Sequence, residues 1–156
     1  MKTERRSAIK KILASAAGLV GFGIAAKANT PKEKVTSGVV TFQDVPLISR
    51  STKYGNLLFL TGRGGYGAEP FTIENHTKVA LDLIEEELIN RGSSMEKVLQ
   101  ATVLIDDMAN YNGLNAAYKG RFGAKPPART TLVVAKGGIP GNSGKSLVEI
   151  DCIAYI

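Results

Sequence analysis

The sequence holds one cysteine and one histidine among its 156 residues, and these shortages exclude several kinds of site. With Cys152 as its only cysteine, the chain forms no internal disulfide, and the alternating apolar residues around Cys152 favour a buried, unreactive thiol. With His76 as its only histidine, it has no site built from several histidines, and we interpret His76 as a surface or interface residue. No Ser-His-Asp set, Cys-His pair or metal-ligand cluster is recognisable either, so neither a metal nor the matching nucleophilic chemistry is expected.

Phosphate-binding motifs are missing as well. The glycine-rich run Gly62-Arg63-Gly64-Gly65-Tyr66-Gly67 has neither a Gly-Lys-Ser/Thr end nor the GxGxxG pattern that opens a helix. Glycine at this density lets the backbone approach a ligand closely. The run is therefore either a tight surface loop or the wall of a pocket.

Charge of one sign is concentrated at the N-terminus. The net charge of the chain is +6, but residues 1–28 hold six basic residues and one acidic residue. That leaves 14 basic and 13 acidic residues in residues 29–156, a net charge of +1. The body is nearly neutral, so we expect no nucleic-acid partner.

The basic N-terminal segment has the organisation of an export signal. Arg5-Arg6 precedes an apolar run at residues 12–26, and Ala26-Lys27-Ala28 fits a small-x-small cleavage site. The run is shorter than the about 20 residues that span a bilayer. We expect residues 1–28 to be a signal of the twin-arginine type, although Ala8 replaces the usual phenylalanine. The general export route and an ordinary amphipathic helix are the alternatives. The prediction is an exported, periplasmic protein without a membrane anchor after cleavage.

Apolar spacing predicts two helices in the body of the chain. Residues 72–91 place apolar side chains on one helical face, with Thr72 as the N-cap and Gly92 at the end. Residues 108–122 form the second helix, which Asp106 and Asp107 precede as capping carboxylates.

Apolar alternation and turn residues predict the strands. We expect them at residues 39–42, 47–54, 57–61, 98–105, 129–135 and 147–156. A hairpin joins the second and third strands at Gly55-Asn56, and the last two strands could also pair as a hairpin. The order predicts one α+β domain over residues 29–156, with two helices on a mixed sheet.

One pair of residues is a candidate for chemistry. Arg129 enters its strand after Pro126 and Pro127, and its planar guanidinium matches a carboxylate. Glu149 lies on the last strand, and a carboxylate there can position or deprotonate a water molecule. Both residues could face a pocket near residues 62–65. A surface ion pair at Arg129, or a cross-strand salt bridge between Arg129 and Glu149, explains the same residues.

Several short motifs along residues 45–156 resemble the RidA/YjgF family of enamine/imine deaminases. The matching pieces are Gly55-Asn56-Leu57-Leu58-Phe59, Thr61-Gly62, Arg91-Gly92-Ser93-Ser94, Val103 through Asp107-Met108, Asn115-Ala116-Ala117-Tyr118, Pro126-Pro127-Ala128-Arg129 and Val148-Glu149-Ile150. The Pro-Ala-Arg and Val-Glu-Ile pieces are the most specific of these.

This resemblance implies a chorismate-mutase-like α+β fold in a homotrimer with a barrel-like centre and active sites between subunits. It implies that Arg129 binds the carboxylate of a 2-imino acid and that Glu149 orients the attacking water. Gly62, Asn115 and Thr131 would line the cleft. The implied reaction hydrolyses a small anionic enamine or imine to a 2-oxo acid and ammonia, without a cofactor.

The sequence departs from the family pattern at three places. Ile48 stands where members commonly have a ligand-contacting tyrosine, Arg63 adds a cation beside the cleft, and the loop at residues 137–146 is longer than usual. We keep Ile48 and Arg63 as candidate substrate-binding residues. The alternative function is a non-catalytic trimer that binds small carboxylates or client proteins in a chaperone-like role.

Overall fold

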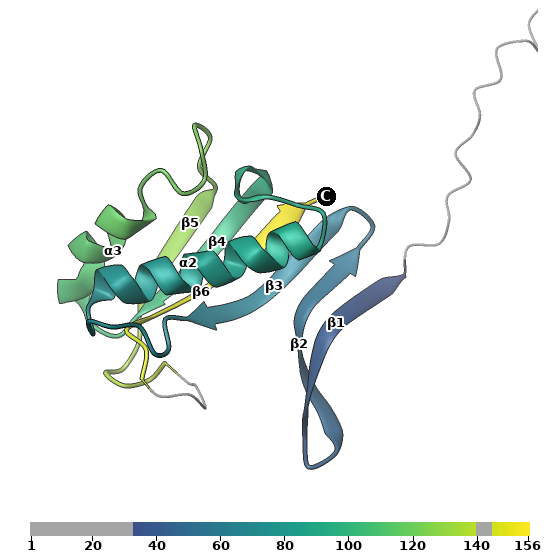
Figure 1. Cartoon of the computed structure of the whole chain (residues 1–156), viewed down its shortest axis with the longest axis horizontal. Helices are drawn as coiled ribbons and strands as arrows, with labels where there is room; N and C mark the ends of the chain where they lie inside the picture. Colours follow the sequence, from purple (N-terminus) through teal and green to yellow (C-terminus); the bar gives the residue numbers. More distant parts are fainter. Residues whose placement is uncertain (1–32, 140–144) are drawn as a thin grey trace, which may run out of the picture. The chain divides into compact units, whose positions relative to one another are not determined.

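Six strands form one mixed sheet in the computed structural model, which describes residues 33–139 and 145–156 (Figure 1). The predicted export signal lies outside these residues. The strands are β1 (Lys34–Phe42), β2 (Val45–Tyr54), β3 (Leu57–Gly64), β4 (Val98–Ile105), β5 (Ala128–Val133) and β6 (Val148–Tyr155). Their order is β1-β2-β3-β6-β4-β5; β4 and β5 are parallel, and the other neighbours are antiparallel.

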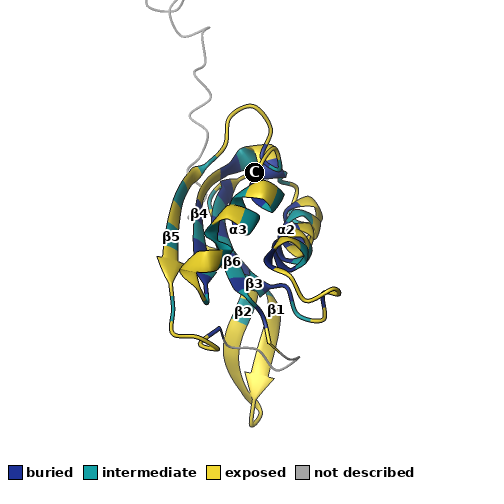
Figure 2. Ribbon diagram, turned by 90° about the vertical axis from the view of Figure 1, so that its left-hand side faces the viewer, coloured by how far each residue is buried: buried dark blue, intermediate teal, exposed yellow. Residues whose placement is uncertain are grey.

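Two helices, α2 (Ile73–Asn90) and α3 (Tyr111–Tyr118), lie on one face of the sheet (Figure 2). Short 3-10 turns, η1 (Met95–Lys97) and η2 (Met108–Asn110), precede β4 and α3. The predicted two-layer α+β fold is confirmed. No helix in the described part of the chain is long and apolar enough to span a bilayer.

The core forms where the helical stripe meets the alternating strands. On α2, Ala80, Leu81, Ile84 and Leu88 are buried at i, i+3 and i+4 spacing, as predicted. Thr72 is the N-cap, since its hydroxyl accepts a hydrogen bond from the backbone N–H of residue 75.

The last strand shows the alternation that its sequence predicts. Val148, Ile150, Cys152 and Ala154 are buried against the helices, while the intervening side chains lie on the opposite face. Burial raises the pKa of the Cys152 thiol to about 12, and the carboxylate of Asp151 adds to this shift. The prediction of a buried thiol is confirmed.

The predicted hairpin of the last two strands is wrong. β5 pairs in parallel with β4, and β6 lies between β3 and β4. Parallel neighbours need a crossover connection, which α3 supplies between β4 and β5. β6 then occupies the position between β3 and β4. In this position the backbone N–H and C=O groups on both edges of β6 are hydrogen-bonded to neighbouring strands.

Several element boundaries also differ from the prediction, and two of them by four residues or more. The first strand begins at Lys34 rather than residue 39, because it pairs with β2 along almost its whole length. The second helix ends at Tyr118 rather than residue 122, because Gly120 (φ 79°) and Gly123 (φ 70°) adopt left-handed conformations that a right-handed helix cannot include.

Candidate functional site

Arg129 lies at the start of β5, in a cluster formed with one stripe of α3. Its Nη2 donates hydrogen bonds to Asn115 Oδ1 at 2.7 Å and to Tyr111 Oη at 3.4 Å. The guanidinium carbon lies 4.7 Å from the centroid of the Tyr118 ring and 5.8 Å from that of the Tyr111 ring. The three helical residues recur at i, i+4 and i+7, so they share one face of α3, and all three contact the guanidinium.

The guanidinium of Arg129 keeps donors for a ligand. Its Nε and Nη1 groups have no hydrogen-bond acceptor, and no acidic side chain pairs with it, among the described residues. The surface ion pair that the sequence left open is therefore not formed with any described residue. Burial raises the pKa of Tyr118 to about 12, and the positive charge of Arg129 opposes this shift only in part. Since Tyr118 stays neutral, the cluster carries the full positive charge of Arg129.

Glu149 lies on β6 in a second cluster, beside a bulge in β3. From Leu60 to Arg63, β3 runs three residues, whereas the paired segment of β6 runs only two. The pairing is therefore interrupted at Thr61 and Gly62, where β3 has one residue more than β6. A Cβ atom built at Gly62 would lie 2.6 Å from the carboxyl carbon of Glu149. Only glycine fits there with the carboxylate in this place, so the bulge is shaped around Glu149.

The surroundings of Glu149 favour its protonated form. Burial raises the pKa of this carboxyl group, and the nearby charge of Asp151 raises it further. Tyr66 lies close by: burial raises the pKa of its phenol, and the charge of Glu149 adds to that shift. A carboxylate with a raised pKa is a stronger base, as activation of a water molecule requires.

Arg129 and Glu149 do not meet within one chain. The register of the sheet aligns Glu149 with Leu104 on β4, and Leu104 with Leu132 on β5, three residues beyond Arg129. Successive side chains of a strand point to opposite faces, so Arg129 lies on the helix side and Glu149 on the open side. No hydrogen bond or ion pair between these two residues is formed. The prediction of a cross-strand salt bridge between Arg129 and Glu149 is therefore wrong. The prediction that both residues face one pocket within a single chain is wrong as well.

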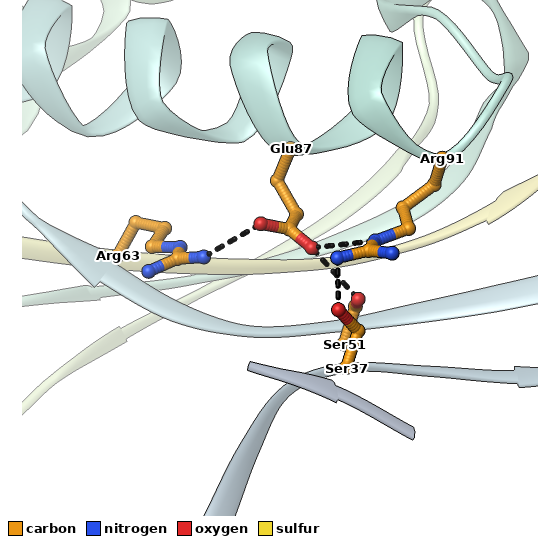
Figure 3. Close-up of polar contacts among 5 residues, drawn as sticks. All are labelled: Ser37, Ser51, Arg63, Glu87 and Arg91. Carbon is orange, nitrogen blue, oxygen red and sulfur yellow. Dashed lines mark hydrogen bonds and ion pairs between the residues drawn. The ribbon is translucent and has the colours of Figure 1, made fainter. Parts of the chain in front are cut away.

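The other predicted site residues divide between these clusters and the rest of the sheet. Thr131 is two residues after Arg129, on the same side of β5, whereas Gly62 belongs to the Glu149 cluster. Arg63 lies on the helix side of β3, where its Nη2 is 3.4 Å from Glu87 Oε2 (Figure 3). Ile48 is 50% exposed and pairs with Val40 in the β1–β2 hairpin. Within one chain, neither Arg63 nor Ile48 adjoins Arg129.

His76 is buried, so its interpretation as a surface residue is wrong. Its Nδ1 accepts a hydrogen bond from the backbone N–H of Leu147 at 3.2 Å, and burial lowers its pKa. The neighbouring Ser146 hydroxyl accepts from the N–H of Gly65 at 2.9 Å and donates to the carbonyl of Val148 at 2.7 Å. These bonds join α2, the glycine-rich loop and the residues that lead into Glu149.

Sequence reasoning missed four side chains around the two halves of the site. These are Tyr111, Tyr118, Tyr66 and Ser146. The two tyrosines of α3 carried a signal, because an asparagine inside a helix is a poor helix former and the tyrosines flank it at helical spacing. No group of three His, Cys, Asp or Glu side chains suited to a metal occurs among residues 33–139 and 145–156.

Comparisons with known proteins show the family to which the chain belongs. The family model described as Endoribonuclease L-PSP matches residues 46–156. The protein mmf2, mitochondrial, of Schizosaccharomyces pombe is 33% identical over 109 residues, which are 68% of this chain and 85% of that protein. The Reactive Intermediate Deaminase A, chloroplastic, of Arabidopsis thaliana is 29% identical over 140 residues, 85% of this chain and 71% of that protein.

Solved structures show the same fold. The crystal structure of a member of the YjgF/YER057c/UK114 family from Mycobacterium tuberculosis superposes with a TM-score of 0.66 at 25% sequence identity. The superposition covers 80% of this chain and 100% of that one.

Proposed function

The chain belongs to the Endoribonuclease L-PSP family, also called the YjgF/RidA family, and from this premise we propose that it is an imine deaminase. The proposed reaction hydrolyses small 2-imino and 2-enamino carboxylates to 2-oxo acids and ammonia, without a cofactor. The observation that carries the proposal is the guanidinium of Arg129, which Asn115 and two tyrosines hold in place while two of its donor groups lack acceptors among the described residues.

Arg129 anchors the carboxylate of the substrate. A planar guanidinium donates two parallel hydrogen bonds to a carboxylate and so fixes its orientation as well as its position. The aromatic rings of Tyr111 and Tyr118 limit the movement of the guanidinium, which lowers the entropic cost of binding.

Glu149 positions and deprotonates the water. The oxygen of the water attacks the iminium carbon, while Glu149 takes one proton and a carbinolamine forms. The proton then moves from Glu149 to the nitrogen. As the carbon–nitrogen bond breaks, Glu149 takes the proton of the hydroxyl group, so that the carbonyl of the 2-oxo acid forms and ammonia is released. Glu149 then passes this proton to the solvent, which restores the carboxylate. The iminium carbon is already electrophilic, so an anchored substrate and a positioned water suffice.

A complete site needs residues of two chains. Arg129 and Glu149 lie on opposite faces of one sheet, so we propose a homotrimer in which the Arg129 cluster of one subunit meets the Glu149 cluster of its neighbour. The open face of the sheet supports this arrangement, since Phe59, Leu132 and Tyr155 are 39%, 51% and 40% exposed there. Apolar side chains gathered on an open sheet face mark a protein interface.

The name of the Arabidopsis relative supports a deaminase, while the description of the family model names a ribonuclease. The near-neutral charge of residues 29–156 does not favour RNA as the substrate.

The test generates 2-iminobutanoate in situ and measures its disappearance with semicarbazide, for the wild type and Arg129→Ala. We expect the variant to lose nearly all acceleration, and Arg121→Ala, which removes an arginine bound to Asp82 and Glu85, to retain it. Equal rates for wild type and Arg129→Ala would overturn the proposal. A parallel incubation of the wild type and Arg129→Ala with RNA tests for ribonuclease activity. RNA cleavage that is equal in both proteins would not depend on Arg129, and so would not belong to the proposed site.

A further inference from the structure

A cluster of charged and hydroxyl groups lies at the C-terminal end of α2, apart from Arg129 and Glu149. Glu87 is only 8% exposed and accepts hydrogen bonds from Ser51 Oγ at 2.8 Å and from Arg91 Nε at 3.0 Å. Arg63 Nη2 lies 3.4 Å from its other oxygen, and Arg91 also donates to the hydroxyl of Ser37 (Figure 3). The cluster links the β1–β2 hairpin to the helix.

This cluster has an excess of positive charge. Burial favours a higher pKa for Glu87, but the hydrogen bonds from Ser51 and Arg91 and the charges of Arg91 and Arg63 outweigh burial and lower its pKa. Glu87 is thus a carboxylate at neutral pH, and it faces two guanidinium groups. Among these described residues the two guanidinium groups outnumber the one carboxylate, and Arg63 also lies within range of the charges of Glu86 and Arg50, which act on it in opposite directions.

A cavity of about 240 Å³ opens beside Arg91, and its polar wall consists of groups that can donate hydrogen bonds. The ammonium of Lys53, the amide of Asn90 and Nη1 of Arg91 have no hydrogen-bond partner within the described chain. Ser37 uses its oxygen as an acceptor for Arg91, which leaves its own proton to donate. Among the residues that the structure describes, no acidic side chain lines the cavity. The unpaired donors and the positive charge of Lys53 together favour an anion.

The remaining wall of the cavity is apolar. Val35 of β1, Leu58 of β3 and Ile156 after β6 supply it. Inorganic anions gain nothing from such a wall, whereas a carboxylate with a hydrocarbon tail buries the tail there. The volume is below that of pockets for drug-sized ligands, so the tail contains only a few carbon atoms.

We propose that this cavity binds a short-chain aliphatic carboxylate, at a site separate from the one that contains Arg129. The carboxylate accepts hydrogen bonds from Lys53, Arg91 and Ser37, and the aliphatic chain lies on Val35 and Leu58. The occupied site ties α2 to the β1–β2 hairpin through the ligand.

The test is calorimetric titration of the full chain with butyrate and, separately, with inorganic phosphate. The protein carries Arg129→Ala, so that the proposed catalytic anchor contributes no carboxylate binding. We expect one butyrate per chain, with affinity above that for phosphate. Lys53→Gln should weaken butyrate binding at least fivefold, whereas Lys78→Gln, an exposed lysine of α2, leaves it unchanged.

A second variant tests the apolar wall. Val35 is 57% exposed, so Val35→Asp is compatible with folding and places a negative charge in the cavity. It should abolish the binding of butyrate while the circular dichroism spectrum stays that of the wild type. The proposal is overturned if Arg129→Ala alone abolishes all carboxylate binding, if phosphate binds more tightly than butyrate, or if Lys53→Gln and Val35→Asp bind butyrate as the parent does.

Discussion

Arg129 and Glu149 lie on opposite faces of the same sheet, with β4 between their strands. Neither the register nor the alternation of side chains lets one chain present both to one ligand. In the proposed deaminase, the guanidinium of Arg129 and the carboxyl group of Glu149, whose pKa is raised, are thus two half-sites. Two copies of the chain can together supply both residues to one site.

Mixed trimers test this complementation directly. Arg129→Ala and Glu149→Gln should each be inactive, but trimers reassembled from equal amounts of both should regain about a quarter of the wild-type activity. The reason is that about three quarters of such trimers are mixed, and each mixed cyclic trimer contains one interface with both native residues. The measurement is the deamination rate after the denatured variants are refolded together. If the mixture is no more active than the separately refolded variants, the site is not shared.

Asn115 should control the affinity for the carboxylate through its bond to Arg129. Asn115→Ala removes the acceptor at 2.7 Å and should raise KM about tenfold, the effect of losing one hydrogen bond to a charged group. Asn115→Asp keeps the shape but pairs Arg129 with a carboxylate, so it should raise KM more than the alanine does. Steady-state kinetics of the two variants give the comparison. An aspartate variant with the wild-type KM would show that the charge of Arg129 does not bind substrate.

Gly62 should matter for turnover rather than for binding. Its Cβ in Gly62→Ala would lie 2.6 Å from the carboxyl carbon of Glu149, so the carboxylate must move. A displacement of about 1 Å in a catalytic group costs up to about a hundredfold in rate. We expect kcat to fall at least tenfold with little change in KM. The thermal midpoint measured on the same sample separates this effect from unfolding, and a kcat equal to the wild-type value would contradict the role of Glu149.

Local patterns in the sequence predicted the elements that build the site. Thr72 as the N-cap of α2 and the alternation through Cys152 on β6 depend on neighbours within a few residues, and both are confirmed. The stretch from Pro126 to Arg129 was also assigned correctly to the entry of a strand. The residues that determine such features lie within a few positions of them in the sequence.

The arrangement of the site could not be predicted in the same way. The relative positions of Arg129 and Glu149 depend on how β5 pairs with β4 and how β4 pairs with β6. Local periodicity in the sequence contains no information on the register between strands. His76 was misassigned for a similar reason. Its partners, Ser146 and Leu147, follow 70 residues later, and nothing near His76 in the sequence indicates that they will cover it.

The burial of His76 leads to a last prediction, on the pH dependence of stability. Burial lowers the pKa of His76 below its usual value of 6.5, although the charges of Asp106 and Glu69 oppose this shift. Well above pH 6.5 the imidazole is neutral in both states, so its contribution to stability is complete. As the pH falls below 6.5, the unfolded chain binds the proton first, and the free energy of unfolding decreases down to the lowered pKa.

The loss from this one group cannot exceed about 1.4 kcal/mol per pH unit within that window. In the folded protein, protonation also removes the acceptor for the N–H of Leu147, so the 145–147 segment should loosen first. Urea unfolding between pH 5 and pH 8 measures the effect against His76→Asn, whose amide oxygen can accept the same bond without titrating. The difference between the two proteins cancels contributions from Glu149 and other carboxyl groups. A constant difference across this range would show that His76 does not titrate on unfolding.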